Sequence, residues 1–372
     1  MVYEADPAAD FGFGGLVHEF TTAKNLGYAH YLNDIGEAFW TVNQDEHRVL
    51  GDMRSQFGTA HVVIARNDEA VWRGVLAELD ANMDDVIMYA YGYEHILYHL
   101  LSTWNMTWEN TELGGASGTP INALWSRAVS MTNSQLAFAS TGTIQAPVTT
   151  SNGSTAIEME SYKLYFKRIL HAFKELVAIA ASDTTNVCYF ELDHGTSPTA
   201  ETLTFNFWKD NGEDTGIRLT YPGLITNFND RYVPIYTRND ILSVGSGARD
   251  QLYRGQEHTT TGTFGSAAFG RRQEPIYFTW VRDESELDRV TKRRKAKAIR
   301  EDINMFVRLQ PNAGLLPWRA SGSGYELGDR IRIDIDRGIT QINKMMFVEG
   351  QQVVYVGGQE FVQPLLADRP GS

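Results

Sequence analysis

Two histidines four residues apart are the side chains best spaced to do chemistry. His95 and His99 would share one face of a helix, and paired imidazoles at that spacing can bind zinc. Glu94 would lie roughly 120° around the helix from the midpoint of the two histidines, so it cannot complete a ligand set. The sequence also lacks the HExxH pattern. We therefore interpret the pair as exposed or interface histidines and expect no metal site.

The glycine-rich segments and the single cysteine do not fit a cofactor site. Residues 12–15 (GFGG) have no strand before them and no helix after them, and residues 245–248 (GSGA) lack the spacing of a dinucleotide fingerprint. Neither GxxxxGK[ST] nor GxSxG occurs. Cys188 stands in an apolar, strand-like run without a nearby histidine, which is typical of an inert core thiol. We expect no bound cofactor.

Neighbouring carboxylates could serve as a general acid and base, and the chain has two such pairs. Asp84 with Asp85 and Glu213 with Asp214 both fall where the sequence predicts turns. Solvated turn residues are the simpler interpretation. No catalytic constellation stands out, so we expect a protein that is not an enzyme and has no catalytic residues.

A basic run at 289–300 holds seven cations: Arg289, Lys292, Arg293, Arg294, Lys295, Lys297 and Arg300. Acidic residues flank the run within the same predicted helix. We favour a solvated or subunit-facing helix, and we keep open pairing with an acidic region of the chain or contact with a polyanion.

The charge of the 372-residue chain is concentrated in its first part. The whole chain has a net charge of −13, and residues 1–110, with 5 Lys/Arg and 17 Asp/Glu, contribute −12. An acidic region does not bind DNA by counterion release. The 42% of apolar residues allow a sizeable core in two or three domains. One cysteine excludes a disulfide framework, and we expect neither a membrane span nor a secretory signal.

Alternating apolar residues predict a β-rich chain with few helices. In the first third we expect strands at 16–22, 39–42, 60–66, 71–79 and 85–91, with helices at 44–57 and 93–101. In the middle third we expect a helix start at Thr119-Pro120, a loop at 139–155, a helix at 161–181 and strands at 187–192 and 203–208. In the 161–181 helix, Tyr165, Phe166, Ile169 and Phe173 would share a buried face.

The last third shows the same alternation of strands and turns. We expect strands at 217–221, 224–228, 232–236 and 240–245, a loop at 258–272, a helix at 283–306 and four closing strands at 330–336, 340–348, 352–356 and 360–366. Asp283 and Glu286 would form a capping box at the start of the helix.

Five segments occur in a recognisable order. Residues 60–66 (AHVVIAR) and a turn precede 71–76 (VWRGVL), which holds a WxG pattern, and 85–93 (DVIMYAYGY) follows. Much later come 240–247 (DILSVGSG) and, after the long helix, 325–333 (YELGDRIRI). In this order the segments resemble the tail-tip baseplate hub proteins of long-tailed bacteriophages and of related contractile machines.

The resemblance implies an α+β, β-rich fold with two barrel-like β domains that flank an inserted domain. The expected first barrel-like domain is 1–112, the inserted α+β domain is 113–216, and the second barrel-like domain is 217–372 with the long helix 283–306. Hubs of this family form trimers in which the paired domains make a quasi-sixfold ring. The chain stops soon after its last strand, so we expect another chain to carry any lytic or receptor-binding activity.

The resemblance also implies the place and partners of the protein. It would be a structural virion protein at the tail tip, assembled in the host cytoplasm, and a homotrimer that adapts the sixfold tube to a threefold tip. Its partners would be the distal tail protein, the tail tube, the tape measure protein and tip fibre or spike proteins. The ring would line the conduit for the tape measure and for DNA, which passes without sequence-specific binding.

Two other functions remain open at this point. Eight tryptophans offer stacking surfaces for a carbohydrate-binding tail or surface protein. Trp72, Trp125 and Trp208 lie in amphipathic patterns that favour core packing, whereas Trp104 and Trp108 are less clearly buried. A hydrolase with a site dispersed along the chain is the other alternative.

Overall fold

The computed structural model describes most of the chain. The described residues are 1–5, 13–43 without 22, 58, 60–102 without 83, 106–112, 120–124 without 122, 158–180, 188–193, 204–209, 212–230, 238–245, 253–261, 265–278, 281, 284–298, 304–311 and 324–367. Within them, strands greatly outnumber helices, as the sequence predicts.

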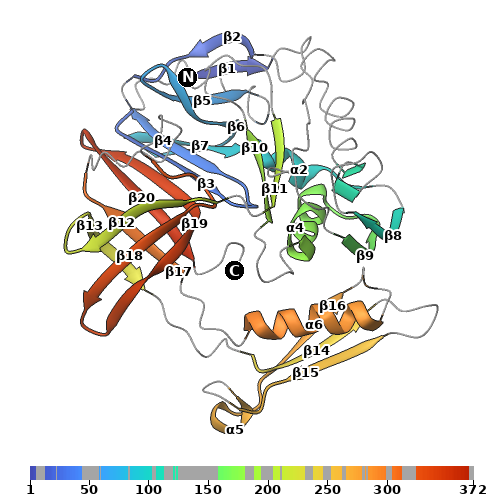
Figure 1. Ribbon diagram of the computed structural model, residues 1–372. Coiled ribbons are helices and arrows are strands. Elements are labelled where there is room, and N and C mark those ends of the chain that lie inside the picture. The colour runs from blue at the N-terminus through green and yellow to red at the C-terminus, as the bar shows by residue number, and fades with distance from the viewer. Residues whose placement is uncertain are drawn as a thin grey trace.

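The N-terminal strands form one half of a large, mainly antiparallel sheet (Figure 1). They are β1 (Val2–Ala5), β2 (Phe13–His18), β3 (Asn25–Tyr31), β4 (Glu37–Asn43), β5 (His61–Arg66), β6 (Glu69–Ala81) and β7 (Asp85–Gly92). Their spatial order is β3-β4-β7-β6-β5-β1-β2. The predicted meander from 60 to 91 is present, but β2 ends at His18 and not near residue 22.

The C-terminal strands form the other half of that sheet. They are β12 (Asp214–Tyr221), β13 (Ile225–Asp230), β17 (Asn304–Leu309), β18 (Arg330–Arg337), β19 (Thr340–Val356) and β20 (Gln359–Ala367). Pairing runs β12-β18-β19-β20-β17-β13, and only the β12–β18 pair is parallel.

Strand β19 joins the two halves. Its first part pairs with β18, and its second part pairs with β3 through Gly350–Tyr31 to Val356–Asn25. The prediction of two strands, 340–348 and 352–356, was wrong because Gly350 does not break the strand. A Cβ atom there would lie 2.7 Å from Cδ1 of the Tyr31 ring, so the glycine allows close packing between neighbouring strands.

A smaller layer holds the helices α2 (Glu94–His99) and α4 (Ile169–Ala180) with short strand pairs. The strands are β8 (Met106–Glu112) with β9 (Glu158–Leu164), and β10 (Cys188–Asp193) with β11 (Thr204–Lys209). The predicted helix at 161–181 was therefore wrong over its first part. Tyr162 and Leu164 are buried on β9. Helix α4 begins only after Phe166, whose φ of 45° is outside the range of a right-handed helix.

Two of the four residues that were expected to share a buried helix face lie at the surface between β9 and α4. Tyr165 and Phe166 are 52% and 60% exposed, whereas Ile169 and Phe173 are fully buried. A strand exposes alternate side chains, so the aromatic spacing that fits a helix also fits β9 followed by a turn.

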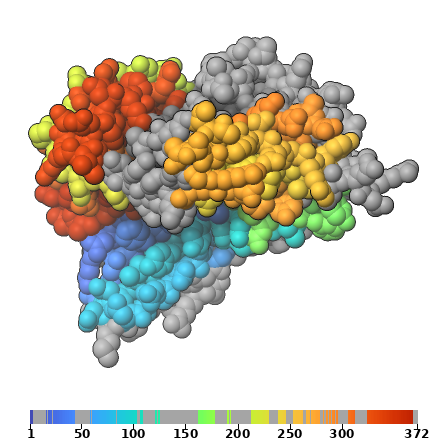
Figure 2. All heavy atoms as spheres, turned by 90° about the horizontal axis from the view of Figure 1, so that it is seen from below, coloured from blue at the N-terminus to red at the C-terminus, as the bar shows by residue number. Residues whose placement is uncertain are grey.

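The third sheet stands apart below the other strands in Figure 1 and faces the viewer in Figure 2. It contains β14 (Asp240–Gly245), β15 (Arg254–His258) and β16 (Gln273–Phe278), with β14 in the centre. Helix α6 (Glu284–Ala298) packs on it through Leu287, Val290 and Thr291. The helix predicted at 283–306 is too long at its end, because Phe306 lies in β17 (Asn304–Leu309). The short helix α5 (Ser266–Phe269) lies within the predicted loop 258–272.

Several predictions fall outside the described residues: the helix at 44–57, the loop at 139–155, the strand at 232–236 and the capping residues Asp283 and Thr119. Residues 120, 121, 123 and 124 are helical, and Ile121 and Leu124 are buried. The buried apolar residues of the described chain form two clusters, one that includes strands of both halves of the large sheet and one that includes residues of α2, α4 and α6. None of the described helices has the length and apolar character needed to cross a lipid bilayer.

Candidate functional site

The WxG pattern on β6 serves packing. Trp72 is fully buried, and its Nε1 donates a hydrogen bond of 3.3 Å to the carbonyl oxygen of Ala29 on β3. A Cβ atom on Gly74 would lie only 2.1 Å from the carbonyl oxygen of Tyr91 on β7. The tryptophan side chain fills the space between strands, and the glycine lets the β7 backbone come close to β6. Both residues therefore stabilise the packing of strands in the N-terminal half of the sheet.

The LGD pattern before β18 links two strands that are far apart in sequence. Gly328 adopts a φ of 91°, which favours glycine. Asp329 Oδ2 accepts a hydrogen bond of 2.8 Å from the Glu326 amide, and its Oδ1 accepts one of 2.9 Å from the Glu213 amide. The Arg330 amide in turn donates to the Glu213 carbonyl. The pattern therefore aligns the parallel strands β12 and β18.

The two carboxylate pairs identified in the sequence lie at turns. Asn82 Oδ1 accepts hydrogen bonds from the amides of Asp84 and Asp85, and Asp85 forms an ion pair with Lys24. Asp214 Oδ1 accepts a hydrogen bond of 3.0 Å from the Gly216 amide. These contacts are those of turn residues, and Asp84, Glu213 and Asp214 are exposed while Asp85 is half-buried.

A buried polar cluster beneath α2 was missed by the sequence analysis. His61 at the start of β5 is fully buried, and its Nδ1 shares a hydrogen bond of 2.9 Å with the hydroxyl of Tyr93. Burial, and then the positive charge of Arg73 on β6, lower the pKa of His61 to about 4. Burial raises the pKa of Tyr93. At neutral pH the cluster holds a neutral imidazole and a neutral phenol, which link β5 to the turn between β7 and α2.

Asp240 is a second buried polar group without a sequence signal. Its carboxylate accepts hydrogen bonds from Gln256 Nε2 (2.8 Å), Gln273 Nε2 (2.7 Å) and Arg271 Nε (2.5 Å). Burial alone would raise the pKa of Asp240, but these donors and the charge of Arg271 together lower it. The partners come from β15, β16 and the preceding loop, so the carboxylate holds the third sheet together.

Helix α6 places part of its basic run against acidic residues of its own sheet. Arg294 pairs with Glu274 on β16 at 2.6 Å, and Lys295 pairs with Glu257 on β15 at 2.6 Å. Two cations of the run are thus neutralised locally, and Lys292 is exposed. In the described residues we find no pairing of this helix with the acidic region 1–110.

The histidines of α2 lie together on the exposed side of the helix. Nε2 of His95 and Nε2 of His99 are 3.0 Å apart, and the two rings meet edge to face. Burial, and then the neighbouring His99, lower the pKa of His95. A Cβ atom on Gly92 would meet Glu94 Oε2 at 2.4 Å, so this carboxylate turns back toward Gly92.

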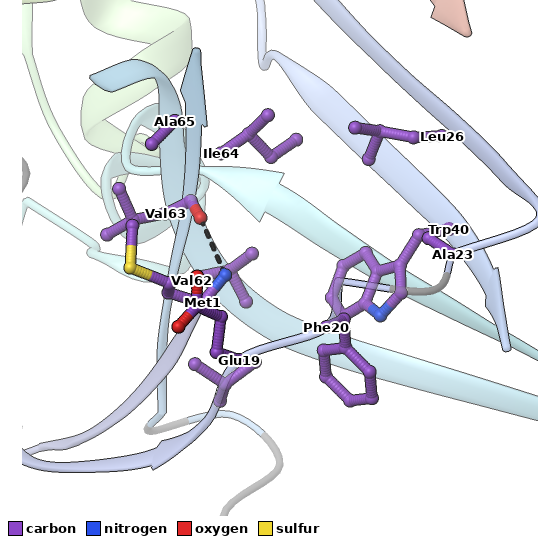
Figure 3. A pocket seen from close by; sticks show the side chains of 11 residues that line it. Met1, Glu19, Phe20, Ala23, Leu26, Trp40, Val62, Val63, Ile64 and Ala65 are labelled. Carbon is purple, nitrogen blue, oxygen red and sulfur yellow. Dashed lines mark hydrogen bonds between the residues drawn. The ribbon is translucent and has the colours of Figure 1, made fainter. Parts of the chain in front are cut away.

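An apolar cavity of about 140 Å³ opens between β1, β4 and β5 (Figure 3). The rings of Phe20 and Trp40 line one side, and Met1 and Val62 line the other. The amino group of Met1 donates a hydrogen bond of 3.0 Å to the carbonyl oxygen of Val63. Apart from Glu19 and this amino group the lining is apolar, so the cavity offers packing surface more than acid–base chemistry.

The remaining candidates of the sequence are structural or lie outside the described residues. Cys188 begins β10, and Gly245 ends β14, where a Cβ atom would meet the Val281 carbonyl at 3.0 Å. Trp108 is buried and stacks on Tyr162 with ring centroids 5.9 Å apart. Gly12, Trp104 and Trp125 lie outside the described residues, and the side chain of Trp208 is not among the described ones.

Comparison with known proteins identifies the fold. No protein-family model matches the sequence, and no curated protein matches it. A tail protein from Neisseria meningitidis MC58 superposes with a TM-score of 0.59 at 11% identity, covering 94% of this chain and 93% of that chain. The 43 kDa tail protein of prophage MuSo2 from Shewanella oneidensis gives 0.59 at 8% identity, covering 93% and 94%. The chain has the β-rich fold of these tail proteins over nearly its full length.

Proposed function

We propose that this protein is a structural component of a phage-type tail and acts as the hub at the tail tip. The observation that carries the proposal is the likeness in fold to two tail proteins over at least 93% of both chains in each comparison. The His61 and Asp240 clusters and the two carboxylate pairs agree with a structural role, because each is buried within the fold or lies at a turn.

The strand order supports two related β domains, as the quasi-sixfold hub requires. The row β12-β18-β19-β20-β17-β13 begins and ends with strands that are consecutive in the chain and separated only by residues 222–224. Such a row is close to a barrel. The N-terminal strands form a second row of similar length, and β3 and β19 join the two. We propose 1–112 and 217–372 as the ring-forming parts and 113–216 as the inserted domain.

In this proposal three chains form a ring that adapts the sixfold tube to a threefold tip. The ring contacts the distal tail protein, the tail tube, the tape measure protein and the tip fibres or spike. DNA passes through it without sequence-specific binding, and the protein catalyses no reaction. It resides in the virion after assembly in the host cytoplasm.

The alternative of a carbohydrate-binding protein has no support from the described tryptophans. Trp40, Trp72 and Trp108 are at most 8% exposed, so their rings are not available as stacking platforms.

The mass of the protein in solution tests the hub. Light scattering coupled to size-exclusion chromatography should give three times the 41.8 kDa of the chain at micromolar concentration. Electron microscopy of the same fraction should show rings with threefold symmetry and a central hole. A monomer at all concentrations, or a dimer without a hole, would contradict the ring and leave only the fold assignment.

A further inference from the structure

The strongest feature that the proposed function does not use is the histidine pair on α2. The two Nε2 atoms are 3.0 Å apart. The His99 side chain is exposed and that of His95 is half-buried, so solvent and ions reach the pair.

The spacing of the two nitrogen atoms selects the kind of metal that fits. With metal–nitrogen bonds of about 2.0–2.1 Å, two nitrogens 3.0 Å apart subtend an angle of about 90° at the metal. Tetrahedral zinc prefers a wider angle, whereas adjacent positions of a square-planar or octahedral ion have this one. The geometry thus favours copper(II) or nickel(II).

Aromatic rings restrain the two imidazoles in this arrangement. The Tyr91 ring lies 4.9 Å from that of His95, and the Tyr98 ring lies 5.5 Å from that of His99. Tyr98 is itself covered by the guanidinium of Arg168, 3.8 Å from its ring centroid. In this contact one Nε2–H donates to the other Nε2, so ion binding requires the donor imidazole to adopt its Nδ1–H tautomer and the His99 ring to turn until both lone pairs point to one ion.

We propose that His95 and His99 form a two-histidine chelating site for a divalent copper or nickel ion. Among the described residues no third histidine, cysteine, aspartate or glutamate completes the set. The chain therefore supplies two adjacent ligands, and water holds the other positions in the isolated protein. This departs from the sequence-based interpretation of the pair as plain surface histidines.

Calorimetric titration of the untagged full-length protein with copper(II) chloride, in a non-coordinating buffer at pH 7.5, tests the site. We expect one tight site per chain. His95→Ala and His99→Ala should each weaken it by about tenfold or more, because the second ligand of a chelate binds at high effective concentration. His171→Ala is the matched control, since His171 lies on α4 with its ring 5.8 Å from that of Tyr98, and it should leave the affinity unchanged.

Electron paramagnetic resonance separates a chelate from single-histidine binding. The wild-type copper complex should show two equatorial nitrogens and the His99→Gln variant only one. Circular dichroism melting of each variant checks that the fold is kept. An isotherm unaltered by both substitutions, a spectrum with one nitrogen in the wild type, or a loss of binding in His171→Ala would overturn the proposal.

Discussion

His61 makes the stability of the N-terminal sheet sensitive to acid. Its folded-state pKa of about 4 lies below the ordinary value of 6.5, so the unfolded chain binds a proton that the folded chain excludes. The stabilisation is complete above pH 6.5 and is lost as the pH falls toward 4. Between pH 7.5 and pH 5 the free energy of unfolding should fall by about 2 kcal/mol from this residue alone.

Urea denaturation of the wild type and of His61→Gln at both pH values measures this effect. The glutamine can keep a hydrogen bond to Tyr93 but does not titrate, so other acid-sensitive groups affect both proteins equally. The drop in unfolding free energy should be smaller in the variant by roughly 2 kcal/mol. Equal drops in the two proteins would show that His61 is not the acid-sensitive group.

At the scale of single residues, the sequence indicated which residues form a pattern more readily than what those residues do in the fold. Trp72 and Gly74 were recognised as a pair, and the structure shows why: the indole fills a gap and the glycine leaves room for the Tyr91 carbonyl. His61 and Asp240 gave no signal, because their partners lie on other strands or turns, 16 to 33 residues away along the chain. Such clusters depend on strand order, which local patterns do not encode.

At the scale of elements, helix α4 should depend on Phe173. This side chain is fully buried, with its ring centroid 5.6 Å from that of Phe190 on β10. Phe173→Ala should lower the free energy of unfolding by about 3–5 kcal/mol, since it removes a ring from a packed core. Phe166→Ala, at a 60% exposed position only seven residues away, should cost less than about 1 kcal/mol. Chemical denaturation of the two variants checks both values, and similar losses would contradict the packing described for α4.

Errors in the predicted elements share one physical cause. Residues 161–166 satisfy both a helical spacing and a strand alternation, and only the pairing of β9 with β8 decides between them. The predicted helix 283–306 likewise continued into β17, because Phe306 fits the same periodicity. In contrast, β5, β6, β7 and β18 were predicted to within two residues at each end, and β7 and β18 show clear alternation of buried and exposed side chains.

At the scale of the whole molecule, the charge of the proposed ring should repel DNA. Three copies of a segment with a net charge of −12 bring about 36 negative charges together, and repulsion reaches farthest at 0.01 M salt, where the Debye length is about 30 Å. Free duplex DNA should therefore not bind in a low-salt anisotropy titration. Tight, salt-sensitive binding that disappears when Arg293, Arg294 and Lys295 are replaced by alanine would show instead that α6 governs the contact with DNA.

The resemblance in segment order predicted the overall fold better than any single motif did. Strand alternation showed that both ends of the chain are β-rich, and the order of the segments indicated a tail protein. The shared sheet was not foreseen, since nothing local in 25–31 or 350–356 marks them as partners. The separate sheet of β14, β15 and β16 was also missed, because its helix resembled a connection within the last domain.

The pairing of β3 with β19 has a consequence for the nascent chain. Residue 25 finds its partner only when residue 356 has been made, and at about 5–20 residues per second this takes roughly 15 to 65 seconds. Until then one edge of β3 has unpaired amide and carbonyl groups that can recruit strands from other nascent chains. Completion of the large sheet is therefore a late, non-local event, and slow folding is expected for such a topology. During synthesis, the N-terminal half of the sheet therefore keeps one unpaired edge until the second part of β19 has left the ribosome.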